Sequence, residues 1–451
     1  MKAGAPLRGW LTAHSTGARL APQPALTTQA TPTEPGLPRL WVDETRQFQA
    51  IEGFGGAFTE AAATTWLRLS PAQQKAFLRD CFCPAQGHGY TLCRVHMNSC
   101  DFSLGHYAHA ETPGDVALHS FSIEHDRQAL LPMIRAAQQV AGRPIKLLVS
   151  PWSPPAWMKS NGRMNDGGAL RPEYREAWAR CFVRFIQAYA EAGVPVWGVS
   201  VQNEPEARQR WDSCLYSAAE ERDFVRDFLG PTLAAAGLAE VRIVVWDHNR
   251  DVMVERASVI YADAEAAKYV WGTGFHWYGE DHFEHVQLVH DAWPDKHLLF
   301  TEGCQEGGPH TGSWALGERY ARSMINDLNR WTVGWIDWNL LLDERGGPNH
   351  VGNFCSAPVL ADASTDSLLH QSSFYYLGHF ARFVQPGARR VLCAATLQAL
   401  ECTAFRNPDG SLAVVAMNRG EQALPFALYL RGATYGAELP PRSIATWMSS
   451  C

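Results

Sequence analysis

Apolar and polar positions alternate along the chain in a way that separates two kinds of segment after about residue 40. Short runs rich in β-branched, aromatic and other apolar residues recur at intervals, and each run predicts a buried strand. Between them lie longer segments with helical periodicity. Eight such runs occur, at residues 50–58, 89–97, 145–152, 196–204, 241–248, 270–278, 297–303 and 333–342.

One intervening segment shows the helical period clearly. Apolar residues recur there at positions i, i+3, i+4, i+7, i+8 and i+11, which gives a helix one apolar stripe that can pack on a sheet. These residues are Trp178, Cys181, Phe182, Phe185, Ile186 and Tyr189.

The eight strand-then-helix units predict an α/β fold of the (β/α)₈ barrel type, with the active site where the C-terminal ends of the strands meet. From about Gly387 short strands replace the helices, and residues 406–418 read as a hairpin around Pro408, Asp409 and Gly410. We expect a fused β-sandwich there, completed by strands near the N-terminus. The predicted parts are residues 1–40 (N-terminal strands, ending in a Thr/Pro-rich connector at 27–38), 41–386 (barrel) and 387–451 (sandwich).

Two glutamates lie at predicted strand ends. Glu204 ends the fourth run and Glu302 ends the seventh, so a closed barrel brings both carboxylates to one pocket. Two carboxylates about 5 to 5.5 Å apart are the apparatus of a retaining glycosidase. Because one charge disfavours the other, we expect the acid/base glutamate to stay protonated to higher pH than a free glutamate. The alternative is that Asn203, Glu204 and Pro205 only form a turn.

Composition narrows the possible partners. The chain has 451 residues, 46% of them hydrophobic, and a net charge of −7, without a block of basic residues. This argues against binding to nucleic acid or anionic lipid. No apolar stretch approaches the roughly 20 residues of a membrane span, and the first residues lack the apolar segment of a signal peptide, so we expect no stable membrane insertion. The oligomeric state stays open.

The eleven cysteines are an odd number, and several lie in apolar runs, which favours buried, reduced thiols and a cytoplasmic location. The protein is instead secreted or periplasmic if a leader has been removed. Cys81 and Cys83 do not have the spacing of a zinc or redox pair, and His282 with His285 lacks the H-E-x-x-H pattern. We therefore expect no metal site.

Several long motifs follow one another in a fixed order. They are EGFGGAFTEAAA, RVHMNSCDFS, SPWSPPAWMKSNG, VQNEPEA, FHWYGE, LLFTEGC and WIDWNLLLDERGGPNHVGNF. From about Ile51 into the C-terminal tail, this series resembles glycoside hydrolase family 30, and particularly its glucosylceramidase branch. The resemblance implies a (β/α)₈ barrel with a fused β-sandwich, retention of configuration at the anomeric carbon, a carbohydrate or glycolipid substrate and no cofactor.

The resemblance also implies roles for individual residues. Glu204 matches the acid/base, Glu302 the nucleophile, and Asn203 the residue that hydrogen-bonds the sugar 2-hydroxyl. The positions that match substrate-binding or orienting residues of the family are Asp101, Trp152, Tyr278 and Trp338 around the sugar, and Arg94, His276 and Asn353 in support.

Some of these residues also have purely structural interpretations. Asp101 can cap a helix, Arg94 can close a buried ion pair, and His276 can be a core histidine with its hydrogen bonds satisfied. With 17 tryptophans in the chain, Trp152 and Trp338 can be core residues that touch no ligand.

The segments beside the predicted pocket affect the substrate. Residues 207–217 and 279–285 are more polar than the matching segments of the lysosomal animal enzymes, which leaves less apolar surface for a ceramide tail. The function we expect is an exo-acting retaining β-glucosidase of the glucosylceramidase type. The alternatives are a β-1,6-glucanase or β-xylosidase of the same family, and a catalytically silent sugar-binding protein, although both carboxylates are present.

Overall fold

A computed structural model describes residues 4–29 and 36–450. The predicted connector at residues 27–38 therefore lies partly outside the described residues. Contacts divide the chain into two compact units. Unit 1 consists of the described residues of the segments 1–54, 311–334 and 370–451, and unit 2 consists of residues 55–310 and 335–369.

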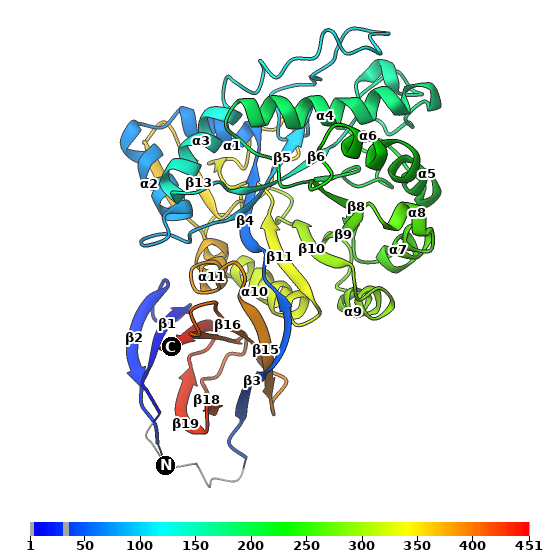
Figure 1. The fold of residues 1–451 in the computed structure, drawn as a ribbon. Coiled ribbons are helices and arrows are strands. Elements are labelled where there is room, and N and C mark those ends of the chain that lie inside the picture. Colours follow the sequence, from blue (N-terminus) through cyan, green and yellow to red (C-terminus); the bar gives the residue numbers. More distant parts are fainter. Residues whose placement is uncertain (1–3, 30–35, 451) are drawn as a thin grey trace. The chain divides into compact units, whose positions relative to one another are not determined.

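Eight strands form a closed barrel, as the sequence predicts (Figure 1). The pairs from β4 to β10 are parallel and follow chain order, with β11 completing the ring between β10 and β4. The strands are β4 (Gly53–Phe58), β5 (Leu92–Met97), β6 (Lys146–Pro151), β7 (Gly198–Ser200), β8 (Arg242–Asn249), β9 (Val270–His276), β10 (His297–Glu302) and β11 (Thr332–Asp337).

The barrel strands are apolar because they are buried on both sides. Every residue of β4, β5 and β11 is buried, as expected for a parallel sheet covered by helices. One cluster of core side chains takes a residue from each of five strands, so the interior is filled. Its members are Leu92, Leu148, Val244, Leu299 and Ile336.

Helices join the successive strands of unit 2. In α4 all six residues of the predicted apolar stripe are buried, which confirms that interpretation. A π-helical turn (Val225–Leu229) links α5 to α6, and 3₁₀ turns lie at Ala156–Met158 and Pro172–Tyr174. The helices are α1 (Glu60–Leu67), α2 (Pro71–Phe82), α3 (Leu130–Ala141), α4 (Arg175–Glu191), α5 (Ala218–Phe224), α6 (Gly230–Ala235), α7 (Met253–Tyr261), α8 (Ala264–Ala267) and α9 (Phe283–Ala292). A small sheet contains β12 (Leu342–Asp343), β13 (Val359–Asp362) and β14 (Ser367–His370).

Unit 1 contains a nine-stranded sheet in the order β19-β18-β3-β15-β16-β17-β20-β1-β2, together with helices α10 (Trp314–Leu328) and α11 (Ser372–Ala381). The hairpin predicted at 406–418 is confirmed, because β16 and β17 pair from Arg406↔Leu412 onward. The strands are β1 (Leu7–Ala13), β2 (Ala21–Leu26), β3 (Arg39–Ala50), β15 (Arg389–Ala395), β16 (Leu400–Arg406), β17 (Leu412–Asn418), β18 (Leu424–Leu430), β19 (Ala433–Leu439) and β20 (Ser443–Met448).

This sheet folds over one hydrophobic core and so forms the predicted sandwich. Phe426 of β18 contacts Trp447 of β20, although four strands separate them in the sheet. A β-bridge between Thr28 and Tyr435 links the two ends of the sheet. The N-terminal strands complete the sandwich, since β1 pairs with β20 from Arg8 to Ala13.

The compact units differ from the expected domain boundaries. A boundary at 40/41 assigns most of β3 to the barrel, whereas β3 pairs with β15 and β18 of the nine-stranded sheet. Residues 311–334, which include α10, also belong to unit 1. The hydrogen-bonding partners of the long strand β3 lie in the nine-stranded sheet, so a domain boundary placed from composition divides this strand incorrectly.

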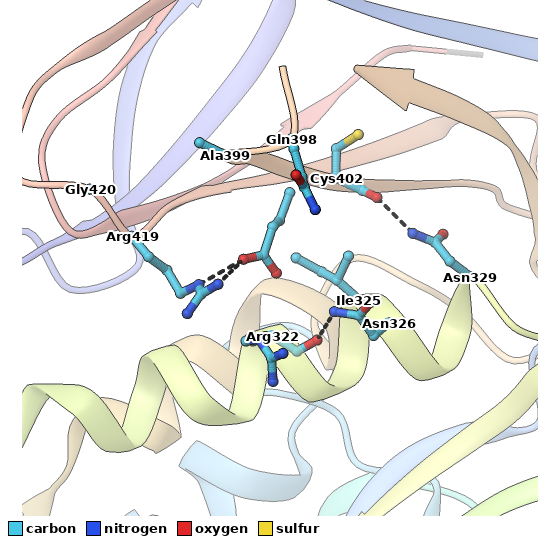
Figure 2. Close-up of a pocket in the computed structure, with 10 residues that line it drawn as sticks. Arg322, Ile325, Asn326, Asn329, Gln398, Ala399, Cys402, Arg419 and Gly420 are labelled. Carbon is cyan, nitrogen blue, oxygen red and sulfur yellow. Dashed lines mark hydrogen bonds and ion pairs between the residues drawn. The ribbon is translucent and has the colours of Figure 1, made fainter. Parts of the chain in front are cut away.

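A cavity of about 520 Å³ in unit 1 lies between α10 and the strands of the sheet (Figure 2). Figure 2 shows Asn329 donating a hydrogen bond to the carbonyl of Cys402. The guanidinium of Arg419 pairs with Glu401 at 2.6 Å. Glu401 is the one carboxylate that lines the cavity, and Arg419 already neutralises it. This cavity therefore does not have the carboxylate pair of a glycosidase.

Candidate active site

The two predicted catalytic glutamates lie at the C-terminal ends of barrel strands. Glu302 is the last residue of β10, and Glu204 follows β7. The backbone N–H of Asn203 donates to Pro151 at the end of β6, and that of Glu204 donates to Asp247 in β8. Glu204 has a left-handed backbone, with φ of 49°. Such a conformation is uncommon outside glycine and directs this side chain away from the strand path.

The structure brings the two carboxylates together. One oxygen of Glu204, one oxygen of Glu302 and a ring nitrogen of His276 all lie within 4.8 Å of one another. Arg94 donates from Nη1 to Glu302 Oε2 at 2.5 Å, and the Tyr278 hydroxyl donates to Glu302 Oε1 at 2.8 Å. Both oxygens of Glu302 are thus held by donors.

Arg94 is fully buried and has four partners. Besides Glu302, its guanidinium donates to Ser150 Oγ, Asn203 Oδ1 and Asp247 Oδ2, each at 2.8 Å. Arg94 therefore does close a buried ion pair with Asp247, and it also contacts the expected nucleophile. The buried ion pair expected for this residue is therefore present, and its supporting role at the site stays a prediction.

His276 connects the two sides of the site. Its Nε2 lies 3.0 Å from Asp247 Oδ1, and its Nδ1 lies 3.2 Å from Glu204 Oε1. Burial alone disfavours its charge, but the charge of Glu302 and the hydrogen bonds with Asp247 and Glu204 raise the pKa of His276 to about 9. At neutral pH both ring nitrogens are therefore protonated and donate to carboxylates.

The two glutamates have pKa shifts of opposite direction. Burial raises the pKa of Glu302 and the charge of Glu204 adds to the rise, which outweighs His276 and Arg94. Burial also favours the neutral form of Glu204, but the charge of His248 and the hydrogen bond and charge of His276 outweigh it and lower its pKa. The expectation that Glu204 itself holds the firmer proton is wrong for the protein without substrate, because the adjacent proton is on His276.

Asp101 lies across the pocket with two amide donors. Its Oδ2 accepts from Asn353 Nδ2 at 3.1 Å and from Asn349 Nδ2 at 3.2 Å. Burial raises the pKa of Asp101 to about 7, and the charges of Glu302 and Glu204 act in the same direction against the two amides. Asn353 thus supports Asp101 directly, and this carboxylate can accept hydrogen bonds from a ligand's hydroxyls.

Trp152 and Trp338 form a stacked pair, with ring centroids 5.0 Å apart and planes 19° from parallel. The Arg94 guanidinium lies 4.7 Å from the Trp152 ring centre. Both rings are almost fully buried, and both line a cavity of about 120 Å³. They are core residues with one side toward a possible ligand, where indoles can pack on the C–H faces of a sugar.

The same cavity collects most of the residues named from the sequence. Asp101, Asn203, Glu204, Tyr278, Glu302 and Asn353 line it together with the two tryptophans. Arg94 and His276 do not line the cavity, but they contact the two glutamates that do. Within the described residues, no residue expected at the site falls elsewhere in the fold.

Sequence reasoning missed several lining residues and one central partner. Asp247 accepts from Arg94 and His276, and these positive neighbours lower its pKa despite complete burial. It is the next-to-last residue of the apolar run at 241–248, so the rule that selected Glu204 and Glu302 at strand ends also points to it. Asp247 does not line the cavity. The lining residues that sequence reasoning missed are Gln209, Trp211, His248, Asn249, Cys304, Glu306 and Cys355.

Comparison with known proteins identifies the family. The model of the glycosyl hydrolase family 30 TIM-barrel domain matches residues 51–384, and that of the family's β-sandwich domain matches residues 387–447. The chain belongs to glycosyl hydrolase family 30. Membership of family 30 makes the protein a glycoside hydrolase, with a carbohydrate or glycolipid as the class of substrate.

Relatives in family 30 cover nearly the whole chain. The lysosomal acid glucosylceramidase of Mus musculus is 39% identical over 419 residues, which cover 89% of this chain and 81% of that protein. The crystal structure of SrfJ from Salmonella typhimurium is 38% identical, with a TM-score of 0.95, over 99% of this chain and all of that one. The endo-β1,6-glucanase BT3312 is 28% identical, with a TM-score of 0.89 over the same shares.

The lengths of the helices bear on whether the chain can cross a membrane. Among the residues that the structure describes, no helix combines the length and apolar composition needed to cross a membrane.

Proposed function

We propose that this family 30 protein is an exo-acting β-glycosidase that hydrolyses β-glucosides with retention of configuration. The observation that carries the proposal is the approach of Glu204 and Glu302, whose nearest ligand oxygens lie within 4.8 Å. Inverting enzymes need about 6.5 to 9.5 Å between their carboxyl groups to admit a water, whereas retaining enzymes need about 5 to 5.5 Å. The spacing therefore supports direct attack by a carboxylate.

Glu302 is the proposed nucleophile. Arg94 and Tyr278 donate to its two oxygens, and they fix the carboxylate in place. It attacks the anomeric carbon as the bond to the leaving oxygen breaks, and the product is a covalent glycosyl ester. The raised pKa of Glu302 means that this carboxylate ionises only above the range of a free glutamate, so activity requires a pH above that point.

Glu204 is the proposed acid/base. In the first step its proton passes to the leaving oxygen, and in the second step its carboxylate removes a proton from the water that attacks the ester. His276 Nδ1, 3.2 Å away, holds the nearest proton in the protein without substrate. Substrate binding removes water from the pocket and so disfavours the charged forms of His276 and Glu204. We infer that this moves the proton from His276 to Glu204.

The remaining lining groups suit a single terminal sugar. Asp101 can accept hydrogen bonds from ring hydroxyls, the stacked Trp152 and Trp338 can pack on a ring face, and Asn203 can donate to the 2-hydroxyl from its amide nitrogen, since its oxygen accepts from Arg94. The small cavity, of about 120 Å³, supports exo action.

Polar side chains, among them Gln209 and Glu306, line the cavity where the leaving group would lie. The likeness to an endo-β1,6-glucanase favours a β-1,6-glucan as the second candidate substrate. Aryl β-glucosides, aryl β-xylosides and a β-1,6-glucan, assayed side by side, separate the two candidates and the xylosidase alternative. Absence of turnover on all of them would leave a sugar-binding protein.

Chemical rescue tests the two roles. Glu302→Ala should abolish turnover, and added azide should restore formation of the α-glycosyl azide. Glu204→Ala should still be glycosylated by substrates with good leaving groups, and azide should then give the β-glycosyl azide. Exchanged stereochemistry would reverse the two roles, and near-wild-type activity of both variants would place the chemistry elsewhere.

A further inference from the structure

A second cluster of ligating side chains lies beside the catalytic cavity. Ligand atoms of His106, Asp212 and His350 all lie within 4.8 Å of one another. The three residues come from three loops at the C-terminal ends of barrel strands: His106 follows β5, Asp212 follows β7, and His350 lies beyond β11. None of them belongs to the proposed catalytic machinery.

Asp212 is completely buried, and only one of its two oxygens is satisfied. Oδ1 accepts from the Ser99 hydroxyl at 2.7 Å and lies 3.0 Å from His106 Nδ1. Oδ2 has no hydrogen-bond partner within the described part of the chain. An unsatisfied buried carboxylate oxygen is costly, so a group is expected to meet it.

His350 presents a lone pair to that oxygen. Its Nδ1 lies 3.2 Å from the carbonyl oxygen of Ser103, which can only accept, so Nδ1 carries a hydrogen. In the neutral ring Nε2 is then an acceptor. Nε2 is buried without a hydrogen-bond partner among the described residues, and it lies 3.7 Å from Asp212 Oδ2. Two acceptors thus face each other across a buried gap.

We propose that His350 Nε2, Asp212 Oδ2 and His106 bind a divalent transition-metal ion such as Zn²⁺. Zinc binds imidazole nitrogen at about 2.0 to 2.1 Å and carboxylate oxygen at about 2.0 to 2.2 Å, so two atoms 3.7 Å apart can share one ion. The carbonyl of Ser103 orients His350 as second partners of metal-binding histidines do. The half-exposed ring of His106 gives the ion a path from solvent.

Lys159 is a competing cation near the cluster. Its ammonium donates to the carbonyl oxygens of Met164 and Ser213, and burial lowers the pKa of Lys159 to about 8. Its charge acts on Asp212 from a distance without satisfying Oδ2. A proton on His350 and a bridging water are the other groups that can fill the gap, and the experiment below distinguishes them from a metal.

The ion would connect two segments beside the catalytic pocket with the loop that carries His106. Trp211, beside Asp212 in the chain, lines the catalytic cavity. Asn349, beside His350, donates to the sugar-facing Asp101. Metal binding at this cluster is therefore a device that positions the loops around the substrate, and it does not depend on which sugar the enzyme cleaves.

The test is a Zn²⁺ titration of chelator-treated protein by calorimetry, with Co²⁺ absorption as a second probe. Wild-type protein should bind one equivalent, and the ion should raise Tm. Asp212→Asn and His350→Gln should each weaken binding by about tenfold or more. Asp212 and His350 are largely buried, so their replacement can also impair folding. His106 is half-exposed, so His106→Asn should fold normally, and it should weaken binding too.

The chain offers a matched control. His282, Glu284 and His285 form another cluster, at the start of α9, with more exposed side chains. His285→Gln should leave the affinity unchanged. The proposal fails if wild-type protein shows no saturable binding below about 0.1 mM Zn²⁺. It also fails if binding survives all three cluster variants, or if it is lost in His285→Gln or Glu302→Gln instead.

Discussion

At the residue scale, the proposed mechanism makes the pH dependence of activity rest on one proton between Glu204 and His276. Activity needs an ionised Glu302, whose pKa is raised, and a proton on the Glu204–His276 pair, where the pKa of His276 is about 9. The profile of kcat/KM should therefore be bell-shaped, with its acidic limb above the usual glutamate range and its basic limb near pH 9. These limbs are apparent constants of the coupled groups.

Replacing the imidazole separates this arrangement from a glutamate acting alone. In His276→Gln the side chain can still hydrogen-bond Glu204 but cannot hold the proton, so the basic limb should fall by about one pH unit or more. His248→Gln is the matched control, because His248 Nε2 lies 3.9 Å from Glu204 Oε1, beyond hydrogen-bonding distance, and burial lowers the pKa of His248. The pH profile of an aryl β-glucoside measures both. A basic limb unmoved in His276→Gln would remove His276 from the proton path.

The location of the expected site residues was predictable where a motif or a strand end marked them. Glu204, Glu302, Asp101 and the two tryptophans were expected from the sequence and do line one cavity. Asp247 was not expected, although it also lies near the C-terminal end of a strand, because only the folded chain shows that Arg94 and His276 share it. Its left-handed backbone, with φ of 52°, has no signature in the sequence.

At the element scale, the eight strands were predictable because each is an apolar run bounded by polar residues. The extent of each strand was less so: β7 pairs only over Gly198–Ser200, and the chain beyond it reaches its neighbours through single backbone hydrogen bonds of Asn203 and Glu204. Irregular backbone at the C-terminal end of a barrel directs side chains into the pocket. The hydrophobic periodicity of the sequence does not reveal where the backbone is irregular.

We expect the loops beyond β7, β9 and β10 to determine the preference for the leaving group. Gln209, Trp211 and Glu306 line the cavity, and Glu206, Arg208, Arg210, Glu280 and Asp281 are exposed nearby in sequence. A long alkyl chain finds little apolar surface there, and a buried methylene is worth about 0.8 kcal/mol, while an exposed one contributes almost nothing. We therefore expect kcat/KM for alkyl β-glucosides to rise by less than about tenfold from short to long chains, below about 1.4 kcal/mol in total.

This expectation is measured below the micelle concentration of each substrate, with the matching aryl β-glucoside as reference. A steep rise that continues with each added methylene would show an apolar path for the tail and would favour glucosylceramide as the natural substrate.

At the scale of the whole molecule, the sequence predicted the two architectures but not how the chain is shared between them. Unit 1 takes three separate segments, and β3 and α10 belong to it although they lie inside the region expected to be barrel. A boundary drawn from composition assumes that each domain is continuous. The long β3, which pairs with β15 and β18, shows why that assumption fails here.

The thiols provide a prediction for the molecule as a whole. All ten described cysteines are free, eight of them are buried, and only Cys83 and Cys393 are partly exposed. Burial raises the pKa of Cys93 and Cys214 to about 12, which suppresses the reactive thiolate. With an aromatic disulfide reagent the native protein should therefore react quickly at few positions, Cys83 among the described ones. Cys393 should react slowly despite its partial exposure, because its contact with Cys402 and burial raise the pKa of its thiol. In denaturant without reductant all eleven cysteines should react. Fewer than eleven would reveal a disulfide and would contradict the reduced state on which the predicted cytoplasmic location rests.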